Sequence, residues 1–435
     1  MTENADRESL GRGPSPIPYV SLFTGAMGLD LGLVKAGFKP VVGNEIDPAA
    51  VATIRYNRPR LPVVTDSIAC IDSTRLAGAS GRDLFGIGLV AGGPPCQPFS
   101  VFGRRQGVKD QRGALLFDFV RLVLEFGPAT FLLENVRGLH SMPLVQARSK
   151  EYTADVAEED LAHGALLREI IRQFECGGYR VDCFLVNVVN YGGPQIRERL
   201  LCIGNRYDLR ASFPSPQFSN RPVDGLPPFR VLGDAIGPGF IDPDPTLMNF
   251  SNRKLGYLAL VPSGGNWRSL PVDVQRESMG KSWYLKGGRS AYWRKLSFDF
   301  PSPTVVTMPN HAGTSMCHPA ELRALTVGEC AAIQEFPRDW AFIGSPADKY
   351  RLIGNAVPVR LGTLAGHVIR GLLGQIAMHG LRPVPIPTVP STIQHIRPHV
   401  RTRRFWRAGE TFAGTHSYYE DAGELLEEST ANATR

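Results

Sequence analysis

The hydrophobic pattern of the chain divides it into regions of different character. From Tyr19 to about Asn205, short apolar runs alternate with amphipathic stretches, which is typical of strands alternating with helices in a parallel sheet. The pattern predicts strands at Tyr19–Phe23, Val41–Asn44, Pro62–Thr65, Ile87–Ala91, Thr130–Leu133, Arg180–Val188 and Leu200–Ile203. It predicts helices at Gly28–Ala36, Pro48–Tyr56, Ala114–Glu125 and Leu161–Phe174. The first half of the chain is therefore expected to form an α/β domain.

The composition and the hydrophobic pattern change after Asn205. Residues 208–317 are rich in Pro, Gly, Ser and Asn with scattered aromatic side chains, and they show no long helical period, which predicts a separate irregular or β-rich unit. Helical patterns return at Glu321–Glu335 and from Val357 to about Met378. The predicted organisation is a disordered lead-in (1–18), a first domain (19–207), the irregular unit (208–317), a segment returning to the first domain (318–378) and a disordered tail (379–435). The tail is basic and then acidic, so a dedicated DNA-binding arm is the alternative.

Composition narrows the possible environments and partners. The 435 residues are 43% hydrophobic and 20% charged, which suits a globular protein, and the formal net charge of +7 favours a polyanionic partner. DNA, RNA and acidic small ligands remain open. The seven cysteines include no C-x-x-C pair and the histidines form no cluster, so we expect neither a metal site nor a disulfide framework. With no apolar run of about 18 residues and no secretory signal, a cytoplasmic protein without a membrane span is expected.

The end of the first predicted strand has the features of a ligand-binding turn. Thr24 to Gly28 form a glycine-containing turn before a helix, where backbone N–H groups are free to bind a ligand. Glu45 follows the second strand, where an acidic side chain can bind ribose hydroxyls, and Asp66 follows the third, where it can accept from an adenine amino group. The turn is not a G-x-G-x-x-G dinucleotide motif, so a nucleoside without a pyrophosphate fits better, and S-adenosylmethionine is one. A turn that serves packing only is the alternative.

A cysteine follows the fourth predicted strand, at the sheet edge where such folds bind substrates. Two prolines stiffen the loop Gly92 to Ser100 ahead of Cys96, and an exposed cysteine there can act as a nucleophile. Glu134 ends the next strand at the same edge. Arg197 and Arg199 precede the last strand and add two guanidinium groups.

The ordered set of motifs resembles the bacterial DNA (cytosine-5) methyltransferases. The resemblance runs from Tyr19 to about Arg370 and rests on FTGAMG, NEID, PPCQPFS, RGALLFDF, ENVRG, QIRER and RLIGNAVP, in that order. It implies a Rossmann-like class I methyltransferase sheet, with residues 208–317 as a smaller target-recognition domain. It also implies S-adenosylmethionine as cofactor, double-stranded DNA as substrate, and a monomer.

The chemistry explains why these residue types are needed. Cytosine C5 is a poor nucleophile, and addition of a thiolate at C6 gives it electron density, a role the resemblance implies for Cys96. The addition pushes negative charge toward N3 and O2, so an acid at N3 and a cation at O2 lower the barrier. The resemblance implies these roles for Glu134 and Arg199. Arg197 is expected to contact the DNA backbone phosphate or to steady the closed cysteine loop.

The resemblance also implies cofactor and DNA contacts. The implied cofactor residues are Phe23, Gly25, Gly28, Glu45, Ile46, Asp66, Pro95, Leu115, Asn355 and Val357. Met27 stands where the family commonly has glycine. A cytosine inside a duplex must be flipped out to be reached, so the basic stretch after Cys96 is expected to close over it as a lid. The expected DNA-binding residues are Ser100, Arg104, Arg105, Lys109 and Arg112 in the lid, and Arg268, Arg289 and Arg294 in the recognition domain.

These motifs support three hypotheses about function. The leading one is a site-specific DNA cytosine-5 methyltransferase, either part of a restriction–modification system or solitary. A tRNA cytosine-5 methyltransferase is the second, and the large segment 208–317 disfavours it. A catalytically inactive DNA-binding regulator is the third, and it is disfavoured by the presence of Cys96, Glu134 and Arg199.

Overall fold

The fold was analysed in a computed structural model, which describes residues 15–95, 111–144, 159, 162–220, 225–284 and 289–396. Its central sheet has eight strands in the order β10-β6-β8-β5-β4-β1-β2-β3. They are β1 (Ile17–Leu22), β2 (Phe38–Asn44), β3 (Val63–Val64), β4 (Leu89–Gly92), β5 (Thr130–Val136), β6 (Arg180–Asn187), β8 (Glu198–Asn205) and β10 (Thr392–His395). All neighbours are parallel except that β8 runs antiparallel to β5 and β6. The predicted α/β sheet is confirmed.

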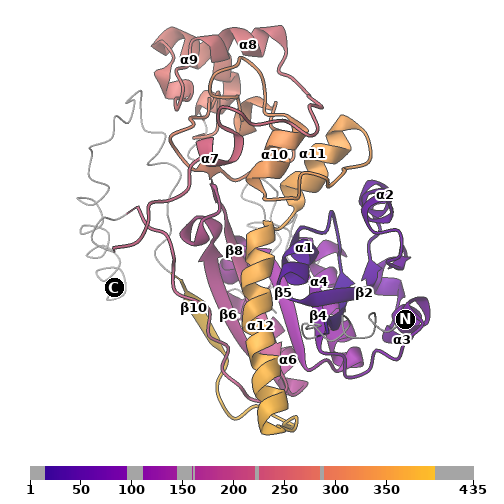
Figure 1. Cartoon of the computed structure of the whole chain (residues 1–435). Coiled ribbons are helices and arrows are strands. Elements are labelled where there is room, and N and C mark those ends of the chain that lie inside the picture. Colours follow the sequence, from indigo (N-terminus) through magenta and orange to yellow (C-terminus); the bar gives the residue numbers. More distant parts are fainter. Residues whose placement is uncertain are drawn as a thin grey trace, which may run out of the picture.

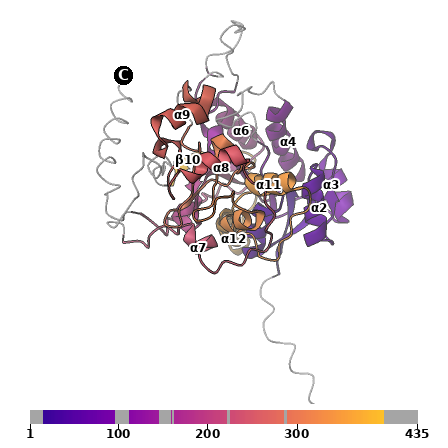
Figure 2. The same ribbon diagram turned by 90° about the horizontal axis from the view of Figure 1, so that it is seen from above.

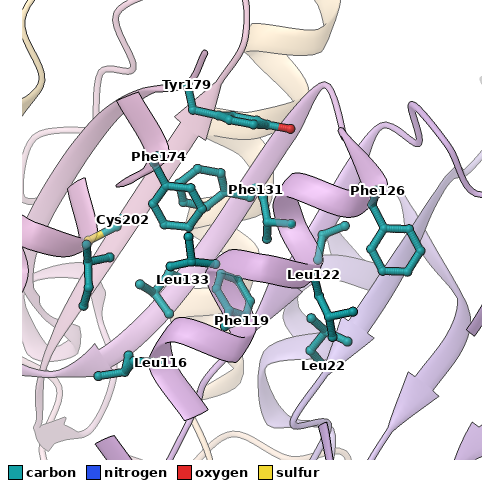
Figure 3. Close-up of a cluster of buried hydrophobic side chains, with 14 of the residues drawn as sticks. Leu22, Leu116, Phe119, Leu122, Phe126, Phe131, Leu133, Phe174, Tyr179 and Cys202 are labelled. Carbon is teal, nitrogen blue, oxygen red and sulfur yellow. The ribbon is translucent and has the colours of Figure 1, made fainter. Parts of the chain in front are cut away.

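Helices cover both faces of the sheet (Figure 1). One face is covered by α1 (Gly28–Lys35) and α12 (Val359–His379), and the other by α3 (Ser73–Ser80), α4 (Gln111–Phe126) and α6 (Ala165–Cys176). On the face covered by α3, α4 and α6, Phe131 of β5 stacks on Phe174 of α6 with ring centroids 4.0 Å apart (Figure 3). The two layers bury apolar side chains on both sides of the strands, which explains why the strands read as continuous apolar runs.

Close backbone packing fixes α1 against α12. A Cβ added at Gly32 would lie 2.2 Å from the Val359 carbonyl oxygen and 2.5 Å from the Thr363 nitrogen. Both are backbone atoms, so only glycine permits this helix spacing. The helical stretch Pro346–His379 is long and apolar enough to span a membrane, but 67% of its apolar window is buried inside the protein, as expected of a core helix.

Residues 208–317 form most of a second unit above the carboxyl ends of the strands, as Figure 1 shows. Its described helices are α7 (Gly233–Ile236), α8 (Asn252–Ala259) and α9 (Val272–Met279), and its short strand β9 (Ser302–Pro303) pairs with β7 (Gln195–Ile196). Trp267 and Trp293 lie in its own hydrophobic cluster. Of the two expectations for this segment, the irregular one holds, with short helices in place of a β-rich fold.

The C-terminal elements differ from the expected boundaries. The helix expected at Glu321–Glu335 is shorter, α10 (Val327–Ile333), and it starts at a capping box between Thr326 and Glu329. The helix α11 (Pro346–Asn355) follows α10 and precedes α12. The helix α2 (Pro48–Asn57) lies beside α11, as Figure 2 shows from above. The tail expected to be disordered from residue 379 is ordered to residue 396, because β10 pairs with β6 at the sheet edge.

Candidate active site

The turn after β1 is built from left-handed backbone conformations. Phe23, Gly25 and Met27 have φ values of 53°, 55° and 66°. Among the described residues, a Cβ added at Gly25 would meet only the Phe23 carbonyl oxygen, at 3.9 Å, so the described part of the chain leaves open space beside this backbone. Met27, the departure from the family pattern, packs its side chain into the hydrophobic cluster under the second unit. Burial of that side chain offsets the cost of a positive φ at a residue other than glycine.

Glu45, at the end of β2, closes the other side of the turn. Its carboxylate accepts hydrogen bonds from the backbone N–H of Gly25 at 2.7 Å and of Asp47 at 2.8 Å. Burial raises the pKa of Glu45, while the backbone N–H groups of Gly25 and Ile46 and the charge of Arg351 oppose the rise. Beside it, the side chain of Ile46 is 60% exposed, an apolar surface suited to a flat base. The open turn, the carboxylate and this surface fit a nucleoside with its ribose at Glu45.

The remaining residues expected at the cofactor differ in their surroundings. Asp66 is exposed and pairs with Arg75 at 3.1 Å. Asn355 and Pro95 are exposed, and Leu115 is half-buried beside the core around α4. The carbonyl oxygen of Val357 would lie 2.3 Å from a Cβ at Gly28. Gly28 therefore permits the close packing of the Val357 backbone on α1.

A buried ion pair occupies the carboxyl end of the sheet. The Arg199 Nε atom lies 2.9 Å from Glu134 Oε1, and the two side chains are only 11% and 10% exposed. Burial raises the pKa of Glu134, and the positive charges of Arg199 and Arg197 oppose this rise. A carboxyl group with a raised pKa can hold a proton at higher pH, as a general acid must.

The same carboxyl group contacts the loop that leads to Cys96. A Cβ added at Gly93 would lie 2.7 Å from Glu134 Oε2, and Asn135 donates to the Pro94 carbonyl oxygen at 3.3 Å. Sequence reasoning missed these roles, although Gly93 lies in the loop from Gly92 to Ser100 and Asn135 in the motif ENVRG. Glu134 therefore lies beside the backbone three residues before the expected nucleophile.

Arg197 is not available to a DNA phosphate. Its side chain is 1% exposed, and its guanidinium donates to the carbonyl oxygens of Val305, Gly354 and Ala356 at 2.8–2.9 Å. The expectation of a phosphate contact is therefore wrong, because these three carbonyls enclose the group inside the protein. Its alternative, support of the closed cysteine loop, stays a prediction, because Cys96 and the residues after it lie outside the described part of the chain.

The expected DNA-binding residues lie mostly outside the described part of the chain. Cys96, Ser100, Arg104, Arg105 and Lys109 fall outside the described residues, and for Arg112 only its place in α4 is described.

In the second unit, exposed Arg268 and half-buried Arg289 have their guanidinium carbons 4.5 Å and 5.2 Å from the Trp267 ring centroid. Arg294 is buried, and its Nε donates to Ser315, so its expected DNA contact is wrong. Among the described residues, no group of His, Cys, Asp and Glu is arranged to hold a metal ion.

Comparison with known proteins gives a consistent family match. A family model described as C-5 cytosine-specific DNA methylase matches residues 17–370. The chain is 40% identical over 363 residues to the Type II methyltransferase M.PspPI of a Psychrobacter species, covering 81% of this chain and 79% of that protein. It is 37% identical over 366 residues to the Type II methyltransferase M.Eco47II of Escherichia coli, covering 82% and 79%.

One solved structure supports the fold. The crystal structure of a DNA modification methyltransferase encoded within an Escherichia coli prophage superposes with a TM-score of 0.55 at 24% identity, covering 82% of this chain and 99% of that chain. The likeness shows that the two chains share a methyltransferase fold.

Proposed function

The chain belongs to the C-5 cytosine-specific DNA methylase family and methylates C5 of cytosine in DNA, and from this premise we propose how its own residues perform the reaction. The observation that carries the assignment is the pair of Glu134 and Arg199, packed against the Gly93 backbone that leads to Cys96. It brings an acid and a cation to the strand edge beside the nucleophile's loop. This grouping is the one that attack at cytosine C6 requires.

Cys96 initiates the reaction on a cytosine flipped out of the duplex. Its thiolate sulfur forms a bond to C6, and the C5–C6 double-bond electrons move so that C5 becomes nucleophilic. Glu134 gives its proton to N3 as negative charge develops there, and Arg199 stabilises the charge at O2. After C5 has been methylated, solvent removes the C5 proton, and the electrons of that C–H bond re-form the C5–C6 double bond. The Cys96 thiolate leaves from C6, and N3 returns its proton to Glu134.

The turn after β1 is the proposed site of S-adenosylmethionine, which supplies an electrophilic methyl group when bound. Glu45 binds the ribose hydroxyls, and its contact with the Gly25 N–H fixes the carboxylate beside the open turn. Ile46 lies against the adenine, and Asp66 accepts from its amino group in exchange for part of its pairing with Arg75. The other proposed contacts are Phe23, Pro95, Leu115, Asn355 and Val357.

The second unit and the lid after Cys96 are the proposed DNA contacts. Basic residues of the lid, exposed Arg268 and half-buried Arg289 provide positive charge for the phosphates or donors for guanine edges. Because the two relatives described above are Type II methyltransferases, we place the protein in a restriction–modification system, acting as a monomer on DNA in the cytoplasm.

Covalent trapping tests the nucleophile and the reaction together. In the presence of S-adenosylmethionine, DNA carrying 5-fluorocytosine at the target should form a stable complex with the wild-type protein, because after methylation the fluorine at C5 cannot leave as a proton. Cys96→Ser should form no such complex while binding the same duplex, as measured by gel shift. Trapping of Cys96→Ser at the wild-type rate would refute the assignment.

A further inference from the structure

Three buried polar side chains form a connected group beneath the second unit: Gln195, Arg197 and Gln334, named here the polar hub. Gln195 and Gln334 have no exposed surface and Arg197 is 1% exposed. The Gln195 Nε2 atom donates to Gln334 Oε1 at 2.7 Å and to the Ile333 carbonyl oxygen at 3.1 Å. Such a group is costly to bury unless its hydrogen bonds are satisfied, so its partners indicate what it holds in place.

Most of those partners are carbonyl oxygens at the end of α11. Gln334 Nε2 donates to Ile353 at 2.8 Å and Ala356 at 3.2 Å. Arg197 Nη2 donates to Gly354 and Ala356, each at 2.8 Å. The last carbonyls of a helix have no partners within the helix and carry partial negative charge, so a buried guanidinium and an amide satisfy them well. The polar hub thus caps α11 from within the core.

The capped segment lies directly beside the proposed cofactor site. Asn355 is exposed, and the Val357 backbone packs on Gly28, the first residue after the turn that contains Gly25. A shift of this segment would therefore move two proposed cofactor contacts, Asn355 and Val357, without a substitution at either residue.

The same hub is continuous with the catalytic strand. Arg197 is two residues from Arg199, and its backbone N–H donates to Asn187 Oδ1 at 3.0 Å, which fixes the start of β8 against β6. Arg197 also donates to Val305, which follows β9 in the second unit. One guanidinium therefore connects the cofactor side, the base-binding strand and the recognition unit.

We propose that Arg197 and Gln334 are positioning residues, which hold the Asn355–Val357 segment at the cofactor turn and in a fixed relation to Arg199. The inference rests on the proposed function and assigns a role to residues that touch neither cofactor nor base. In this proposal, buried Arg197 positions the cofactor segment, whereas its neighbour Arg199 stabilises charge on the base.

Substitution of Gln334 tests this role by separating cofactor binding from general stability. Gln334→Met keeps the volume but removes both donated hydrogen bonds, so we expect the Kd of S-adenosylhomocysteine to rise about tenfold by calorimetry. At saturating cofactor, kcat and 5-fluorocytosine trapping should stay within about threefold of wild type, because the residue makes no contact with the reacting atoms. Arg197→Lys, which keeps the charge and reaches fewer carbonyls, should raise the same Kd by a smaller factor.

Asn205→Ala is the matched control. Asn205 is also a buried amide with bonds to backbone, here Tyr207 and Leu209, but it lies at the opposite end of β8 from Arg199. Its loss should lower Tm and leave the Kd unchanged.

The proposal is overturned if Gln334→Met lowers Tm but leaves the Kd within about twofold of wild type. Should Gln334→Met not fold, Arg197→Lys decides by the same criterion. Wild-type protein that binds no S-adenosylhomocysteine would refute the cofactor assignment itself, a result distinguishable from an unchanged Kd in the variants.

Discussion

Replacement of Glu134 by Gln isolates the proton that the mechanism requires at N3. The substitution keeps the shape of a side chain that is 10% exposed and packed on Gly93, and the amide oxygen can still accept from Arg199. The fold should therefore persist. What is lost is the ability to donate a proton, and a positioned general acid contributes roughly 10²–10⁴-fold in rate.

The structure places the expected loss in the lower half of that range. Arg199 stays 2.9 Å from the position of the carboxyl group and continues to stabilise charge at the pyrimidine O2 edge. We therefore expect methyl transfer to slow by roughly 10²–10³-fold, which corresponds to about 3–4 kcal/mol in activation free energy. DNA binding, measured by gel shift, should change little.

The pH dependence gives a second signature. The active form of Glu134 is protonated, and burial raises its pKa, so its contribution is present at low pH and is lost as pH rises through that raised pKa. Single-turnover methyl transfer should be measured from about pH 5, just above the ordinary pKa of a glutamate, up to about pH 9. The Gln variant should lack the falling limb that Glu134 contributes. A variant with the wild-type rate and profile would refute the assignment.

Two further predictions concern the cofactor turn and the α1–α12 contact. Glu45→Ala removes a carboxylate bonded to the Gly25 and Asp47 N–H groups and should weaken S-adenosylhomocysteine binding by roughly 10–100-fold in calorimetry, with duplex binding unchanged. An equal loss of cofactor and DNA affinity would indicate unfolding instead. Gly32→Ala places a methyl group against two backbone atoms and should destabilise the protein by about 1–3 kcal/mol in thermal or urea unfolding. The control Gly371→Ala, on the exposed surface of α12, adds a Cβ that meets no described atom within 4 Å apart from its own helix backbone and should be neutral or stabilising. An equal loss in both variants would contradict the packing argument.

Local sequence determined the elements whose stability depends on their own residues. The apolar runs of β1 to β6 and of β8, and the helices α1, α2, α4 and α6, follow from periodicity, because a strand buried on both faces must be apolar along its length. The turn between β1 and α1, Glu45 at the end of β2 and Glu134 at the end of β5 could be placed for the same reason. In a parallel sheet, the residues after each strand meet at one edge. The short helix α3 and the two-residue strand β7 were not predicted by the sequence pattern.

Tertiary contacts decided what local patterns could not. The four-residue strand β10 forms because β6 offers an open edge, although the two segments are about 210 residues apart in sequence. Arg197 and Arg199 look equivalent in the motif QIRER, yet carbonyls more than 100 residues away bury the first, while Glu134 pairs with the second. Arg294 is similarly enclosed by Ser315. A guanidinium is stabilised by whichever acceptors surround it, and only the folded chain brings those acceptors together.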